Sequence, residues 1–344
     1  MAHVTDVTAL GSRPRRRMLL LGSARRRTIA RQIGSALLTL FLISIVTFGM
    51  MSVRTPDQVA REKFGNQVTT EQVAAFSHQY GLDKPVYVRY GKWLWRFAHG
   101  DMGTSYVTGV PVSTNVLPRF KRTLILSIVS LLIAFPISIA IGVFQARRVG
   151  SWADLSLLSG SVVIAALPEF VVGIGLLFLF AVELGWLPVD SATALTFASS
   201  FGEQAKAYVL PAATLVLAIV PYIARIARGS LREALGMPYT QAAVLRGLSR
   251  RTVIWDHAMR NAGVPLVNAV AINIVYLLSG VIVVEWVFAF PGIGQGLVQA
   301  TSTSDAFNVE AIALVMGAMF IGVSVAADLT VAYLNPRLKA AAGR

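Results

Sequence analysis

The chain has 344 residues, of which 55% are hydrophobic and only 14% are charged. A soluble domain of this length carries roughly a quarter charged residues, so the composition argues against a water-exposed globule and indicates a protein surrounded by lipid. The net charge is +14. Cysteine is absent, which excludes disulfide frameworks, iron–sulfur clusters and cysteine-ligated zinc.

Six hydrophobic runs reach the length of about 20 apolar residues that a membrane-spanning helix needs. They cover residues 33–53, 123–146, 155–182, 207–224, 261–284 and 311–334. The first run follows three arginines, but it is too long for a signal-peptide core and no small-residue cleavage pattern follows it. We therefore expect an all-α membrane protein with six transmembrane helices.

The segments between these runs differ in charge. One group holds 20 Lys and Arg against four acids, in segments 1–32, 147–154, 225–260 and 335–344. The other group holds 11 basic and 11 acidic residues, in segments 54–122, 183–206 and 285–310. The positive-inside rule places the first group, and with it both termini, in the cytoplasm. The basic residues lie beside membrane spans and lack an aromatic stacking platform, so they do not indicate nucleic-acid binding.

The outer segment, 54–122, is too long for a simple connector. Thr69 and Gln72 form a capping-box pattern and Gly81 is a stop signal, which together predict a helix between them. The aromatic residues at 93, 95 and 97 favour a belt at the membrane interface. At the cytoplasmic end, we expect 1–32 to be a poorly ordered basic tail in contact with anionic lipid.

The inner segment, 225–260, predicts a short helix from Tyr239 to Leu245, between Gly236-Met237-Pro238 and Gly247. A second helical stretch, 250–260, leads into the next span. Two interpretations of the short helix stay open. It docks into a groove of another protein, or it belongs to an ordinary basic loop that contacts lipid head groups.

Glu169 and Asp328 are the only acids well inside hydrophobic runs, which makes both candidate pathway residues. Glu169 follows Pro168 and is the stronger candidate, because Asp328 lies near a helix end where water or an arginine can satisfy it. The four histidines show no metal-ligand spacing and the phosphate-binding loop motif is absent. We therefore expect no metal and no cofactor in this chain.

The inner segment also carries a resemblance. Residues 239–249, then 257–262 and Pro265, resemble the signature loop of the dipeptide/oligopeptide ABC importer permeases. Further stretches similar to the same family lie at 81–85, 100–105, 147–154, 185–188, 284–294 and 335–337. The resemblance covers about residues 30–340.

This resemblance implies the type I ABC importer permease fold in a prokaryotic inner membrane. A first helix at 33–53 and an extracytoplasmic segment at 54–122 would precede a core of five helices over 119–334, and 335–344 would be cytoplasmic. The implied partners are a homologous second permease, two ATPases that bind ATP and Mg, and an extracytoplasmic solute-binding protein. The chain would be a non-catalytic subunit forming half of a channel for di- and oligopeptides.

The resemblance also assigns residues. The short inner helix would be the coupling helix that contacts an ATPase, through Tyr239, Gln241, Ala242, Ala243, Leu245 and Gly247. The wider family often has an acid at the position of Gln241, so no charged contact is expected there. Glu285 and the Pro291-Gly292 turn match the motif after the fifth span, and we expect them to gate the outer face.

Other functions stay open at this point. The same kind of permease would serve for nickel or another small solute. A stand-alone proton-coupled transporter would use Glu169 and Asp328, although no inverted repeat is visible in the sequence. A membrane enzyme is disfavoured, because no His, Asp or Ser groups cluster near one interface.

Overall fold

The computed structural model describes residues 14–65, 67–196 and 200–334. Within them, side chains lie outside the description at 14–30, 62–63, 328 and 331–334. Over the described ranges the regular elements are helices, apart from one isolated β-bridge between Thr104 and Pro111. The predicted all-α fold is confirmed.

Among the described residues, five single helices are long and apolar enough to cross a membrane. They are α1 (Pro14–Ser52), α5 (Ser113–Arg147), α9 (Phe201–Gly236), α12 (Met259–Val287) and α14 (Ala306–Leu334). Helix α1 begins inside the basic tail, so the backbone from Pro14 is helical where we expected little order. Helix α9 continues 12 residues beyond the predicted end of the span at 224, which places Arg228 on the same helix as the span.

The third predicted span is not one continuous helix. Helix α6 (Trp152–Ala166) and helix α7 (Glu169–Leu177), the latter continued by the π-helical segment η1 (Phe178–Glu183), meet at an angle of 101°. Pro168 causes the break, because it lacks an N–H group and forces the preceding residue out of the helical region. Leu167 accordingly has the extended angles φ −84° and ψ 135°. With this bent pair counted as one span, the described part of the chain holds six candidate spans.

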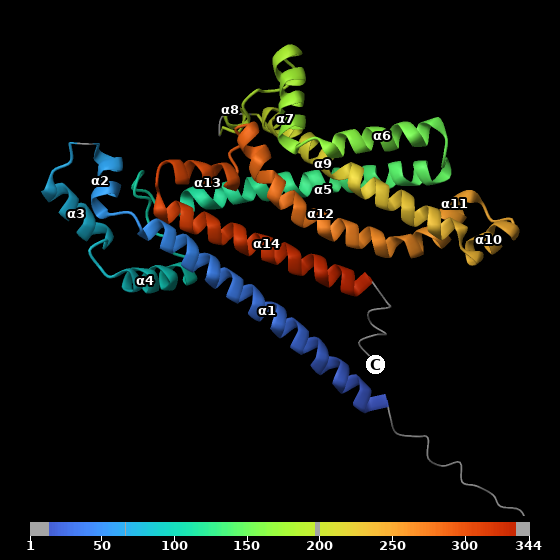
Figure 1. Cartoon of the computed structure of the whole chain (residues 1–344), viewed down its shortest axis with the longest axis horizontal. Coiled ribbons are helices and arrows are strands. Elements are labelled where there is room, and N and C mark those ends of the chain that lie inside the picture. The colour runs from blue at the N-terminus through green and yellow to red at the C-terminus, as the bar shows by residue number, and fades with distance from the viewer. Residues whose placement is uncertain (1–13, 66, 197–199, 335–344) are drawn as a thin grey trace, which may run out of the picture.

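Helix α9 forms the centre of the bundle and is its most buried span, whereas α1 is the least buried. Helices α5 and α12 pack against α9, α14 packs on α12, and α1 lies along α14 at the periphery (Figure 1). The main core cluster joins α5, α9 and α12 and includes Leu126, Leu215, Ile219, Val281 and Phe288. Large apolar side chains remain exposed on the outer helices, as lipid requires.

Helices α5 and α9 cross closely at Gly142. A Cβ atom added to Gly142 would overlap the Cβ atom of Ala227 and would lie 3.0 Å from the Ala224 carbonyl oxygen. Small residues let the two backbones approach in the same way as in many membrane helix pairs. This crossing therefore depends on the absence of a side chain at position 142.

The outer segment forms three short helices, α2 (Pro56–Phe64), α3 (Thr70–Tyr80) and α4 (Val86–Ala98). The helix predicted from the capping box is confirmed: the Gln72 N–H donates to Thr69 Oγ1 at 3.3 Å, and Gly81 ends α3 with φ +65°. Trp93 is buried, with its ring centroid 5.6 Å from that of Phe48. The predicted interface belt is thus wrong for Trp93.

Figure 1 shows the connecting elements at two opposite ends of the bundle. One end holds α2, α3, α4 and α13 (Ile293–Ser302), with the four-residue α8 (Ser191–Ala194) on the same side. The other end holds the α5–α6 turn, α10 (Pro238–Leu245) and α11 (Arg250–Thr252), which leads through the π-helical η2 (Val253–Ala258) into α12. This is the separation that the charge pattern predicts.

We expect Gly142→Ala to lower the stability of the folded chain, because its methyl group must push α5 and α9 apart. Overpacking of this kind costs about 1–3 kcal/mol, which a lower unfolding temperature of the detergent-solubilised protein would reveal. Gly160→Ala on α6 is the matched control, since a Cβ atom there meets nothing within 4 Å. Equal unfolding temperatures for both variants would contradict the close crossing.

Candidate functional site

Helix α10 follows α9 after a sharp turn at the cytoplasmic end. The Thr240 hydroxyl donates to the Ala234 carbonyl at 2.8 Å, and the Gln241 amide donates to the Gly236 carbonyl at 3.2 Å. Thr240 and Ala243 are buried against the rest of the chain. These contacts fix the direction of α10 relative to α9, so a force on α10 passes to α9.

The opposite side of α10 is open to solvent. Tyr239, Gln241 and Ala242 are exposed, and Leu245 at the end of the helix is 89% exposed. Gly247 terminates the element with φ +78°, a conformation that favours glycine. Of the residues assigned to coupling, Ala243 alone faces the interior, so it supports the helix and offers no free surface. The exposed apolar tip favours protein docking over an ordinary loop.

A buried ion pair fixes the cytoplasmic end of α9, shortly before α10. Arg228 on α9 donates from Nε and Nη2 to the two carboxylate oxygens of Asp154, both at 2.7 Å. The Gly150 N–H adds a third hydrogen bond to Asp154 at 3.0 Å, and Ser151 caps α6. Bidentate pairs of this kind are strong and directional. The pair ties the start of α6 to the part of α9 that carries α10.

The sequence alone does not reveal this pair, because Arg228 falls in the inner segment 225–260, beyond the predicted end of its span at 224. The available signal was the Ser151-x-x-Asp154 capping pattern beside a run of arginines, which marks where α6 begins. It does not tell which of Arg225, Arg228 and Arg232 turns toward the carboxylate.

Glu169 lies directly after the bend between α6 and α7. Its side chain is half-buried, and Oε2 is fully buried with no hydrogen-bond partner among the described residues. A Cβ atom on Gly280 of α12 would lie 2.5 Å from this oxygen, so the glycine makes room for the carboxylate. The cavity beside Glu169 has a volume of about 270 Å³ and includes Tyr222, Asn273 and Tyr276 in its lining.

Glu285 on α12 is completely buried and joins three helices. The Thr123 hydroxyl of α5 donates to one carboxylate oxygen of Glu285. The N–H groups of Gly294 and Gln295 donate to the other at 2.7 and 3.2 Å, and Thr123 Oγ1 accepts from the Ile293 N–H at 2.8 Å. The carboxylate thus satisfies the free N–H groups at the start of α13 and sits at the positive end of its dipole.

The Pro291-Gly292 turn closes around this carboxylate. A Cβ atom on Gly292 would overlap the carboxyl group of Glu285, so position 292 requires glycine. Arg119 of α5 reaches the same turn, donating to the Gly292 carbonyl at 3.3 Å and to Gln295 Oε1 at 3.1 Å. Glu285, Pro291 and Gly292 therefore form one tightly linked unit at the outer end, and their gating remains a prediction.

Asp328 belongs to the backbone of α14, but its side chain lies outside the described residues. Over the described ranges, no group of three or more His, Asp or Glu side chains is arranged to hold a metal ion.

The described residues thus form a multi-span helical bundle with a short exposed helix at its cytoplasmic end. Residues 138–340 match the family described as the binding-protein-dependent transport system inner membrane component, and residues 26–127 match its N-terminal family. The chain belongs to this family.

Curated relatives align over nearly their whole length. A putative peptide transport system permease protein of Brucella suis is 31% identical over 90% of this chain and 98% of its own. A probable peptide ABC transporter permease protein of Sinorhizobium fredii is 29% identical, also over 90% of this chain and 98% of its own. A glutathione transport system permease protein of Salmonella paratyphi A is 32% identical over 88% of this chain and 95% of its own.

The fold has a counterpart among solved structures. An inward-facing form of the MetNI methionine ABC transporter aligns with a TM-score of 0.51 and 18% identity, over 64% of this chain and 96% of that one. This likeness establishes the ABC importer permease fold, and with the family match it makes the chain a multi-pass inner-membrane protein.

We expect Thr123→Val to destabilise the outer end, because valine keeps the shape but removes both the donor to Glu285 and the acceptor for the Ile293 N–H. Leaving such buried groups unsatisfied costs about 1–3 kcal/mol each, measurable as a lower unfolding temperature in detergent. Thr123→Ser keeps the hydroxyl and is the control. A serine variant that loses as much stability as the valine variant would argue against the hydrogen bonds.

Proposed function

We propose that this chain forms half of the membrane conduit of an ATP-driven importer for short peptides. Family membership and the peptide- and glutathione-transport names of the relatives support this proposal. In this assembly a homologous second permease completes the conduit, and an extracytoplasmic solute-binding protein delivers the cargo. The chain itself is non-catalytic, and ATP and Mg bind to two partner ATPases.

Helix α10 is the contact to an ATPase in this proposal. The observation that carries it is an apolar helix tip exposed on a cytoplasmic loop but braced from behind by Thr240 and Ala243. A partner groove would cover Tyr239, Gln241, Ala242 and Leu245. Because α10 is bonded to the end of α9, closure of the ATPase pair would tilt the central span. Such rigid-body motion is how packed bundles switch between two arrangements.

The cavity beside Glu169 is the cargo path in this proposal. Tyr222 and Tyr276 are exposed on the same side, so a second permease facing them would enclose a passage with one carboxylate. An intramembrane carboxylate without a protein partner suits a cargo that carries a positive group. The free amino end of a short peptide is such a group, which makes Glu169 its contact point during passage.

We expect Gly247→Arg to abolish uptake while leaving membrane insertion intact. The arginine must adopt the left-handed conformation of Gly247, which costs about 1–2 kcal/mol, and so it displaces the end of α10. Uptake of a radiolabelled dipeptide by cells carrying the variant measures the effect. Gly247→Asn is the matched control, because asparagine tolerates this conformation. Normal uptake by a correctly inserted arginine variant would refute the coupling assignment.

Glu169→Gln should reduce dipeptide uptake about tenfold or more, because a charged hydrogen bond to the ammonium group is lost. Initial rates in proteoliposomes containing the complete importer give the measurement. Glu183→Gln tests the same change of charge at an exposed position in the adjoining η1 segment and should leave the rate unchanged. An unchanged rate for Glu169→Gln would remove this residue from the cargo path.

A further inference from the structure

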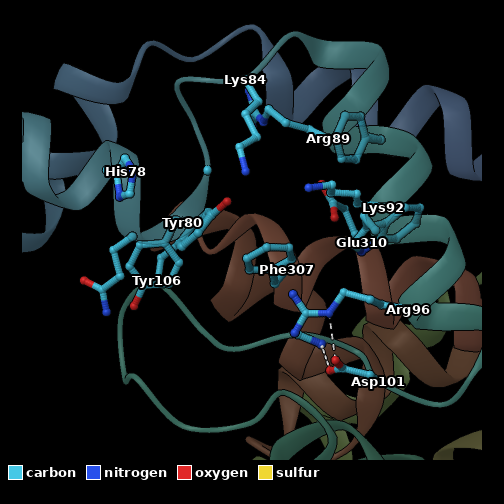
Figure 2. Close-up of a pocket in the computed structure, with 15 residues that line it drawn as sticks. His78, Tyr80, Lys84, Arg89, Lys92, Arg96, Asp101, Tyr106, Phe307 and Glu310 are labelled. Carbon is cyan, nitrogen blue, oxygen red and sulfur yellow. Dashed lines mark hydrogen bonds and ion pairs between the residues drawn. The ribbon is translucent and has the colours of Figure 1, made fainter.

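A second cavity lies at the outer end of the bundle, opposite the cytoplasmic end that carries α10. It has a volume of about 250 Å³ and is enclosed by the end of α3, helix α4, the loop after α4 and the start of α14 (Figure 2). Aromatic side chains form much of its wall, namely Phe48, Tyr80, Trp93, Tyr106 and Phe307. Neither the coupling helix nor the Glu285 unit contributes to it.

Positively charged side chains lie near the opening of the cavity, and a carboxylate is buried inside it. Lys84 and Lys92 are exposed at the rim, Arg89 is half-buried, and Glu310 is buried with 3% of its surface accessible. Figure 2 shows Glu310 beside Lys92, and it shows Tyr80 on the opposite side. Exposed positive groups thus lie at the opening of this cavity, and the Glu310 carboxylate lies deeper.

One further pair of charges in the cavity is already satisfied. Arg96 Nε donates to Asp101 at 2.8 Å. The Gly103 N–H and Arg96 together hold the pKa of Asp101 below its ordinary value, so this carboxylate stays charged. In contrast, Lys84, Arg89 and Lys92 form no ion pair within 4 Å over the described ranges.

Two buried polar atoms in the cavity lack partners. Glu310 Oε2 and Trp93 Nε1 are both inaccessible and have no hydrogen-bond partner among the described residues. One is an acceptor and the other is a donor. Buried polar groups are normally hydrogen-bonded, and unpaired ones call for an explanation. A ligand with both a donor and an acceptor would satisfy the two.

We propose that this cavity binds a small zwitterion, an α-amino acid or a dipeptide, whose ammonium group pairs with Glu310 and whose carboxylate pairs with Arg89, Lys92 and the Trp93 N–H. Tyr106 and Phe307 would contact the carbon atoms between the two charged ends. The volume exceeds the roughly 150 Å³ that holds benzene and lies just below the range for drug-sized ligands. The cavity is therefore of a size that suits this class of molecule.

This site is separate from the proposed cargo path. The cavity beside Glu169 is lined from α6, α7, α9 and α12, whereas the outer cavity is lined from α1, α3, α4, α14 and the loop after α4. The two cavities share no lining residue. Binding at the outer site is thus independent of the proposed transport function, and each can fail without the other.

The test is equilibrium binding to the full-length chain in its native assembly, reconstituted in lipid nanodiscs without the solute-binding protein. The probes are L-alanine, L-alanyl-L-alanine, its N-acetyl derivative and its C-terminal amide. We expect saturable binding of at least one free zwitterion, and a loss of roughly tenfold or more when either end is blocked. The comparison of alanine with dialanine identifies which of the two the site takes. Equal binding of the N-acetyl derivative would indicate a simple anion site and overturn the proposal.

Substitutions in the two cavities show at which of them the ligand binds. Glu310→Gln should weaken the free zwitterion roughly tenfold or more but leave the N-acetyl derivative unaffected. Trp93→Phe removes the indole N–H donor together with part of the ring and should weaken the C-terminal amide least, which keeps the proposal testable if Glu310→Gln does not fold. Asp83→Asn, at an exposed position outside the cavity lining, is the control and should bind normally. Loss of binding in Glu169→Gln but not in Glu310→Gln would place the ligand in the cargo path and overturn the proposal, as would the absence of saturable binding.

Discussion

A buried carboxylate that must find partners shapes the outer end of this protein. Glu285 is fully enclosed, and an unpaired charge in such surroundings is costly. It is compatible with folding only because Thr123 and the first N–H groups of α13 converge on it. That convergence turns the chain back after α12, requires glycine at position 292, and brings α13 within reach of Arg119. The outer ends of α5, α12 and α13 are consequently one rigid unit.

Two further buried carboxylates in the described part of the chain are also surrounded by hydrogen-bond donors. Asp154 is held by Arg228 at the cytoplasmic end, and Asp305 accepts from Ser105, the Tyr106 N–H and Asn308 just before α14. Against these satisfied groups, Glu169 and Glu310 stand out because each retains a buried oxygen with no hydrogen-bond partner among the described residues. Fully hydrogen-bonded carboxylates thus lie at both ends of the bundle. The two incompletely paired carboxylates, Glu169 and Glu310, line cavities.

Much of the fold was predictable because its signals are local. Run length predicted the spans, the Thr69 and Gln72 pair predicted α3, and glycine and proline delimited α10. The features that could not be predicted from the sequence depend on tertiary packing, which decides the direction of a helix after a break and the side to which each side chain points. Pro168 was noticed, but the 101° bend that it produces was not foreseen. Ala243 is buried although both of its chain neighbours are exposed, and Trp93 is buried whereas Trp95 is exposed. Glu310 was assigned to an outer connector although it sits on α14.

The close crossing at Gly142 and Ala227 divides α9 into two unequal parts. Nine residues separate Ala227 from the end of the helix at Gly236, and 26 separate it from the start at Phe201. At 1.5 Å per residue these parts measure about 14 and 39 Å. If α9 tilts as a rod about this crossing, its outer end sweeps roughly three times as far as the end bonded to α10. The helix then acts as a lever whose short arm is cytoplasmic, and a small displacement there is enlarged at the opposite membrane surface.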